Sequence, residues 1–111
     1  MKITYLCLSE LNHNMETFKK IREWAIEREI FSVATPDKQF LKLLEEVGEL
    51  SQGIQKKNEE EIKDAIGDCI VVLTILSSMY NINVENCIDS AYNVISKRTG
   101  KMVNGVFVKD K

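Results

Sequence analysis

The sequence predicts an all-α protein of four helices with a small C-terminal β-hairpin. Apolar residues make up 44% of the 111 positions and recur at helical spacing. Only one proline and five glycines interrupt them. Near the C-terminus, an Asn-Gly pair lies between two short apolar runs, a pattern typical of a two-residue hairpin turn. The chain length, without repeats or linkers, predicts a single domain over residues 1–111.

The first helix is expected over residues 15–28, capped by Asn14 or Asn12. Residues 1–14 form an N-terminal extension, whose start fits a strand or a helical extension equally well. Residues 30–34 are expected to connect the first helix to the second.

The second helix has a clear start, because Thr35 supplies a capping hydroxyl and Pro36 suits the first helical position. Its apolar spacing continues to about Lys56 or Lys57. Asn58 then caps a third helix, and Glu61 stands where it could complete a capping box.

The third helix contains the most apolar run of the chain, residues 69–76, and ends at Asn81. A helix that is apolar on all sides is expected to be buried on all sides, at a bundle centre or in a subunit interface. Asn83 is expected to cap a fourth helix, with Val84, Ile88, Ala91, Tyr92 and Ile95 facing inward. The hairpin then occupies residues 100–109.

Charge and cysteine content exclude several classes of protein. The 15 basic and 17 acidic residues give a net charge of -2 without a long basic run, which argues against dedicated nucleic-acid binding. Cys7, Cys69 and Cys87 form no close pair, so neither a disulfide framework nor a cysteine zinc site is expected. Cys69 is expected to be a small core residue. No segment resembles a signal peptide or a membrane span, so we expect a cytoplasmic protein without membrane partners.

Acidic residues are paired on two successive helices. Glu46 and Glu49 are three positions apart, with Glu45 beside them, and Asp64 and Asp68 are four apart. Such pairs share a helix face and repel each other. Asp68 also directly precedes the apolar run, where an unpaired charge is costly.

Two glycines accompany these acids. Gly48 lies between Glu46 and Glu49, and Gly67 precedes Asp68, so each could allow close helix approach or leave room for a ligand. Converging carboxylates suit Mg²⁺ or Mn²⁺, whereas His13 lies outside the group and does not support a histidine metal site. The alternative interpretation is a solvated acidic face, with the acids after Asn58 simply favouring a helix N-terminus.

The segments 45–50 (EEVGEL) and 64–68 (DAIGD) resemble the MazG-like members of the all-α nucleoside triphosphate pyrophosphohydrolases. The superfamily also contains dimeric dUTPases and phosphoribosyl-ATP pyrophosphatases. The similarity extends over about residues 18–109, and the tail 98–109 resembles that of short, phage-type members.

The resemblance implies metal ligation by Glu46, Glu49 and Asp68, and a water-activating role for Glu45. The sequence departs from the family pattern at Ala65, where a glutamate is usual. Asp64 is the nearest substitute as a fourth ligand, and Glu61 lies on a compatible face.

The implied reaction is Mg²⁺-dependent hydrolysis of a nucleoside triphosphate to a monophosphate and pyrophosphate. Candidate substrate contacts are Asn93, Lys97, Arg98 and Lys101, although these also suit a solvated helix end. Trp24 could stack on the base or pack in the core.

The apolar third helix and the resemblance together predict a homo-oligomer, a dimer or a dimer of dimers. The alternative to an enzyme is a catalytically weak helical module that binds nucleotides or a protein partner, because Ala65 replaces a usual ligand.

Overall fold

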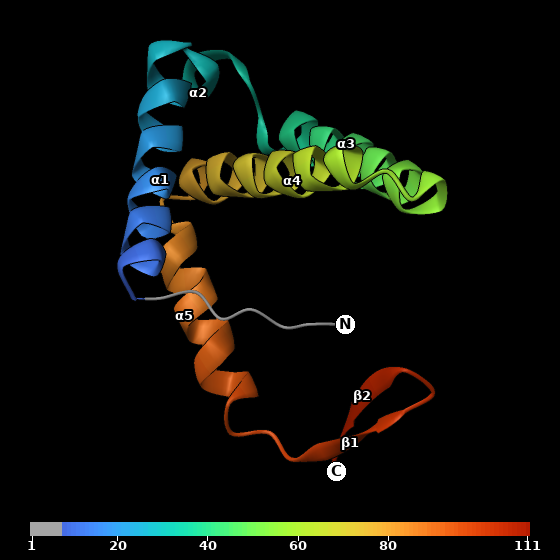
Figure 1. Cartoon of the computed structure of the whole chain (residues 1–111). Helices are drawn as coiled ribbons and strands as arrows, with labels where there is room; N and C mark the ends of the chain where they lie inside the picture. The colour runs from blue at the N-terminus through green and yellow to red at the C-terminus, as the bar shows by residue number, and fades with distance from the viewer. Residues whose placement is uncertain (1–7) are drawn as a thin grey trace.

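The computed structural model describes residues 8–111, with side chains from residue 16 onward. The all-α class and the C-terminal hairpin are confirmed (Figure 1). The prediction for residues 3–7 lies outside the described residues. The elements are α1 (Leu8–Glu27), α2 (Ile30–Val33), α3 (Pro36–Lys56), α4 (Glu59–Met79), α5 (Val84–Ile95), β1 (Gly100–Val103) and β2 (Val106–Lys109).

The N-terminal region is more helical than the sequence predicted. Since α1 begins at Leu8, Asn12 and Asn14 lie inside the helix, and the prediction that either caps it is wrong. The expected connection over residues 30–34 contains the single turn α2. Glu29, at a φ of 59°, reverses the chain direction, and the Ala34 N–H donates to the Ile30 carbonyl at 2.8 Å to close that turn.

Two of the three remaining predicted caps form. Thr35 Oγ1 accepts from the Lys38 N–H at 3.4 Å, and Asn58 Oδ1 accepts from the Glu61 N–H at 3.2 Å. Asn83 occupies the N-cap position of α5 but makes no side-chain capping bond. The sequence therefore placed the starts of α3, α4 and α5 correctly.

The capping box at Asn58 is not formed. Its N–H donates to the Gly53 carbonyl at 3.0 Å, so the Glu61 carboxylate finds no donor there. Glu61 Oε2 instead lies 3.7 Å from Lys56 Nζ. Because Lys57 adopts the αL conformation, the turn is tight. The end of α3 therefore supplies both the carbonyl that accepts from the Asn58 N–H and the ammonium group beside Glu61.

The close approach of α3 and α4 occurs at Gly53. A Cβ added there would lie 3.2 Å from the Ile62 nitrogen. Of the two alternatives for Gly48 and Gly67, close helix approach is wrong, because a Cβ on either would meet no atom within 4 Å, and open space beside both is what the other alternative expects. The helices meet where the short turn joins them, rather than beside the acidic residues.

Helix α4 is central, as predicted, because it contacts α3, α1 and α5 (Figure 1). The small core consists of Ala25, Ala65, Val72, Ile75 and Val84. The expectation that α4 is buried on all sides is wrong within one chain. Ile66, Ile70 and Leu73 are 41–46% exposed, because the three neighbouring helices leave one side of α4 uncovered.

Helix α5 leaves the body of the molecule at an angle of 103° to α4. The Arg22 guanidinium fastens its start to α1 through two bonds to the Glu85 carboxylate, at 2.7 and 2.8 Å. Of the residues of α5 predicted to face inward, only Val84 is buried. The prediction is wrong for the other four, which are exposed: Ile88, Ala91, Tyr92 and Ile95. No single helix within residues 8–111 is long and apolar enough to cross a membrane. Helices α4 and α5 reach that length and apolar content only when taken together, as a bent pair.

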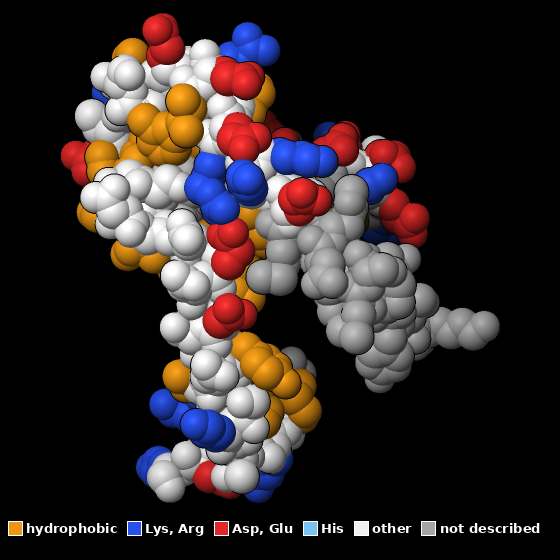
Figure 2. Space-filling model, turned by 90° about the vertical axis from the view of Figure 1, so that its left-hand side faces the viewer, with side chains coloured by type: hydrophobic (Ala, Val, Ile, Leu, Met, Phe, Trp, Pro, Cys, Tyr) orange, Lys and Arg blue, Asp and Glu red, His pale blue; other side chains and the backbone are white. Residues whose placement is uncertain are grey.

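The hairpin has the predicted turn. Asn104 and Gly105 adopt φ angles of 51° and 81°, as a two-residue turn between twisted antiparallel strands requires. Every hairpin residue is exposed. Figure 2 shows hydrophobic side chains at the surface where α5 ends and the hairpin follows. A two-stranded hairpin without cover is marginal in water, and no other element of the described residues packs on this one.

Candidate metal centre

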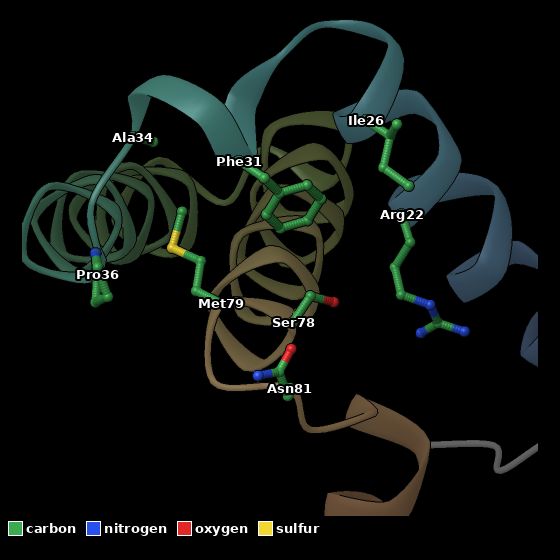
Figure 3. A pocket seen from close by; sticks show the side chains of 8 residues that line it. All are labelled: Arg22, Ile26, Phe31, Ala34, Pro36, Ser78, Met79 and Asn81. Carbon is green, nitrogen blue, oxygen red and sulfur yellow. The ribbon is translucent and has the colours of Figure 1, made fainter.

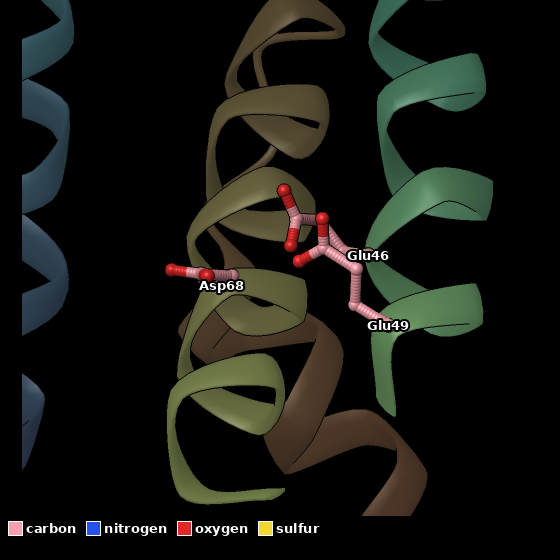
Figure 4. A group of neighbouring side chains, drawn as sticks. All are labelled: Glu46, Glu49 and Asp68. Carbon is pink, nitrogen blue, oxygen red and sulfur yellow. The ribbon is translucent and has the colours of Figure 1, made fainter. Parts of the chain in front are cut away.

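Three predicted metal ligands come together between α3 and α4. Glu46, Glu49 and Asp68 each offer one carboxylate oxygen, and the three oxygens lie within 4.8 Å of one another. Figure 4 shows the Glu46 and Glu49 carboxylates extending from α3 toward the helix that carries Asp68. Three acids this close form a site of concentrated negative charge.

Glu46 is the buried member of this cluster. The residue is only 5% exposed, and its Oε2 atom is buried without a hydrogen-bond partner. Leaving a buried acceptor unsatisfied costs about 1–3 kcal/mol. The other oxygen, Oε1, lies 3.2 Å from Lys42 Nζ. The protein thus keeps a buried carboxylate of which only one oxygen has a partner.

The electrostatics of Glu49 reflect the same crowding. Contact with the Glu46 carboxylate raises the pKa of Glu49, because a proton would convert that contact into a hydrogen bond, and the charges of Glu46 and Glu45 add to the shift. The charge of Lys42 opposes it. A divalent cation would relieve this repulsion, and three neighbouring carboxylates, one of them buried with an unpartnered oxygen, fit Mg²⁺ or Mn²⁺.

A polar cleft of about 380 Å³ opens beside the cluster. Asp64 and Glu61 both line it, as do Glu49 and Asp68. Ala65, at the usual glutamate position, is buried at 3% exposure and contributes only a methyl group. The cleft is lined by Glu49, Gln52, Lys56, Glu61, Asp64, Ala65 and Asp68.

The structure leaves both candidate fourth ligands beside the cleft but outside the group of three close oxygens. Glu61 is paired with Lys56, whereas no ion pair involves Asp64 among the described side chains. Glu45 is exposed on α3, with its Oε2 atom 3.5 Å from Lys42 Nζ.

The candidate phosphate contacts are not brought to this site within one chain. Asn93 lies near the end of α5 and Lys101 in β1, whereas Lys97 and Arg98, predicted at the helix end, lie in the connection between them. None of the four lines the cleft. Figure 1 shows this part of the chain leading away from the α3–α4 pair.

Trp24 is 46% exposed and does not pack in the core. It lines an apolar hollow of about 360 Å³ with Lys20, Ile21 and Val71. Val71 lies one helical turn from Asp68, so the hollow is next to the acidic cluster along α4.

A larger hollow of about 500 Å³ lies between α1, α2 and the end of α4 (Figure 3). Its lining residues are Arg22, Ile26, Phe31, Ala34, Pro36, Ser78, Met79 and Asn81. They include no acid, and Arg22 is engaged by Glu85. Among the described residues, the carboxylates that could hold a metal therefore gather at the α3–α4 cleft rather than at this hollow.

Cys69 follows Asp68 directly and is partly buried. Burial raises the pKa of its thiol, and the nearby carboxylates of Glu46, Asp68 and Glu49 raise it further. Both effects favour the neutral thiol, which is a poor nucleophile. Cys87 is exposed, and Cys7 lies outside the described residues.

Sequence reasoning missed one member of the site, Lys42. It stands four residues before Glu46 on α3, a spacing that places an ammonium group over a carboxylate. That spacing is readable in the sequence, and its importance follows from the burial of Glu46.

Comparison with known proteins places this geometry in context. The model of the MazG nucleotide pyrophosphohydrolase domain matches residues 34–103, which include the whole acidic cluster. An uncharacterized 18.2 kDa protein of Haemophilus phage HP1, encoded in its rep-hol intergenic region, is 46% identical over 68 residues. That alignment covers 61% of this chain and 42% of the phage protein, so the chain spans less than half of this relative. No solved structure matches the chain significantly.

Proposed function

The chain belongs to the MazG nucleotide pyrophosphohydrolase family, and on this basis we propose that it hydrolyses nucleoside triphosphates, ribo- or deoxyribo-, to monophosphate and pyrophosphate. The proposed cofactor is Mg²⁺, with Mn²⁺ as a substitute, held by Glu46, Glu49 and Asp68 with Asp64 as the fourth ligand. The observation that carries the proposal is the unpartnered, buried Oε2 atom of Glu46 inside a three-carboxylate cluster. A solvated acidic face would not bury one of its carboxylates.

In this reaction the oxygen of water forms a bond to the α-phosphorus. The bond between the α-phosphorus and the oxygen that bridges it to the β-phosphorus breaks. Pyrophosphate is the leaving group. A Mg²⁺ ion held by Glu46, Glu49 and Asp68 would neutralise phosphate charge and lower the pKa of the attacking water. Glu45, exposed beside Glu46 on α3, accepts the proton from this water.

For the base, we propose the hollow beside Trp24. The indole face and the Val71 side chain supply apolar contact, and the hollow adjoins the cluster through the turn from Asp68 to Val71. A nucleotide bound there would direct its phosphates toward the acidic cleft.

We further propose that the working unit is a homo-oligomer, a dimer or a dimer of dimers. The chain exposes 9260 Å² at a mass of 12.7 kDa, about half as much again as a compact monomer of that mass. Its radius of gyration, 16.4 Å, exceeds the value of about 13 Å for a compact chain of this length. An apolar groove between α4 and α5, lined by Leu73, Leu76, Val84 and Ile88 among others, remains open. A second copy covering it would also allow Asn93, Lys97, Arg98 and Lys101 to approach a partner's acidic site.

The second candidate function is a nucleotide-binding or protein-binding module without turnover, which Ala65 favours because it removes one family ligand. Pyrophosphate release from a panel of NTPs and dNTPs, with Mg²⁺ and with EDTA, separates the two functions. We expect Mg²⁺-dependent release with at least one nucleotide, and its loss in Asp68→Asn, which removes a ligand charge while keeping the side-chain shape. A folded wild-type oligomer that binds nucleotide yet releases no pyrophosphate from any of them would favour the module.

A further inference from the structure

The ion pair between Lys42 and the buried Glu46 suggests a device that controls metal binding. Lys42 Nζ lies 3.2 Å from Glu46 Oε1 and 3.5 Å from Glu45 Oε2. It is the only basic group paired with the acidic cluster among the described side chains. The Glu46 side chain is 7% exposed, whereas that of Lys42 is 49% exposed.

These two exposures have different consequences. Glu46 is held in place by its surroundings and needs a positive partner, because an unpaired buried charge is costly. Lys42 is anchored only through its own helix, and its flexible arm can swing into water at little cost. The pair therefore combines a fixed anion with a mobile cation.

A divalent cation among the three carboxylates would lie close to the ammonium group on the same Glu46 carboxylate. Positive charges at such short distance repel, most strongly beside a buried group where water screens poorly. A bound cation would supply the positive charge that the Glu46 carboxylate needs, so the ion pair with Lys42 would no longer be favourable. Glu45, three residues from Lys42, still offers the displaced ammonium an exposed partner.

We propose that Lys42 is an internal counter-ion that occupies the Glu46 carboxylate in the metal-free protein and competes with the divalent cation for it. The proposal rests on the metal site of the proposed function. Lys42 thus stabilises the site without metal and weakens its affinity for metal, since any group that favours the metal-free state lowers the apparent affinity.

The test measures Mn²⁺ affinity by calorimetry or electron paramagnetic resonance, and thermal stability in EDTA. Lys42→Met keeps the length of the side chain without its charge, and Lys42→Arg keeps the charge. The matched control is Lys38→Met, one turn earlier on α3, where no ion pair is made among the described residues.

We expect Lys42→Met to bind Mn²⁺ about fivefold more tightly than the wild type and to melt at a lower temperature in EDTA. Lys42→Arg and Lys38→Met should keep wild-type affinity. Equal or weaker Mn²⁺ binding by Lys42→Met, with wild-type binding intact, would overturn the counter-ion role and leave the proposed enzyme standing. If the wild type binds no Mn²⁺, both the metal centre and the role of Lys42 fall.

Discussion

Replacing Glu46 by glutamine tests the metal centre through stability as well as activity. The substitution keeps the shape of the side chain, removes its charge beside Glu49 and Asp68, and converts one oxygen to an NH₂ group. The unpartnered Oε2 atom costs about 1–3 kcal/mol, and an amide in its place can donate to the Glu49 carboxylate. The loss of the Lys42 pair, whose ammonium is exposed but whose carboxylate is buried, offsets this by about 1 kcal/mol, the upper end of the range for surface ion pairs.

The net gain of about 1 kcal/mol should raise the melting temperature of the metal-free variant by about 4 °C for a chain of this size. Mg²⁺ should stabilise the wild type, by about 2.7 kcal/mol at a hundred times its dissociation constant, and leave Glu46→Gln unchanged. Activity should be lost together with that Mg²⁺ response.

The assay is differential scanning calorimetry in EDTA and over a Mg²⁺ titration, alongside pyrophosphate release. Glu27→Gln, an exposed acid in the last turn of α1, controls for the change in net charge. A Glu46→Gln protein that is less stable than the wild type in EDTA, or that keeps the full Mg²⁺ response, would refute the reasoning.

Three further predictions concern the fourth ligand, assembly and pH. Asp64→Ala should raise the Mg²⁺ concentration needed for activity about tenfold, whereas Glu61→Ala should change it little, because Glu61 is already paired; a Mg²⁺ titration that ranks them the other way reverses the assignment. Ile88→Glu, at the open α4–α5 groove, should shift the oligomer toward monomer in sedimentation at micromolar concentration, and a wild type that sediments as an active monomer contradicts the proposed assembly. The hydrogen bonds from Arg22 lower the pKa of Glu85, so the stability from this pair is present above the unfolded pKa of about 4.3 and is lost as pH falls through the lower folded value. Acid unfolding of Arg22→Gln should lack this contribution, and an unchanged pH dependence would show that the pair contributes nothing.

The local signals of the sequence predicted most of the fold. Thr35, Asn58 and the Asn104-Gly105 pair act through bonds to their own neighbours, so their effects are readable without tertiary structure. Asn12 and Asn14 failed as caps because the same residue type is tolerated within a helix, and nothing local excluded the longer helix.

Spacing in the sequence predicted three members of the candidate site, Glu46, Glu49 and Asp68. It did not predict the burial of Glu46 or its pairing with Lys42. Glu46 and Glu49 share a face of α3 by periodicity alone, whereas the burial of Glu46 depends on how α4 packs against that face. The close helix approach considered for Gly48 and Gly67 failed for a related reason. Gly53, beside the interhelical turn, is where the backbones approach, because the turn fixes the distance between the two helices.

The proposed homo-oligomer would explain the exposed apolar face of α5. Hydrophobic periodicity predicts that Ile88, Tyr92 and Ile95 are covered, but it does not distinguish cover by the same chain from cover by another. Within one chain these residues are 50–64% exposed, and burial of apolar surface stabilises by about 25 cal/mol per Å². The inward-facing prediction therefore failed for a single chain, and the amphipathic pattern is one that the proposed partner copy would cover. A metal centre that gathers carboxylates in one chain, with the candidate phosphate-binding cations 97, 98 and 101 placed elsewhere on that chain, fits the same proposed assembly.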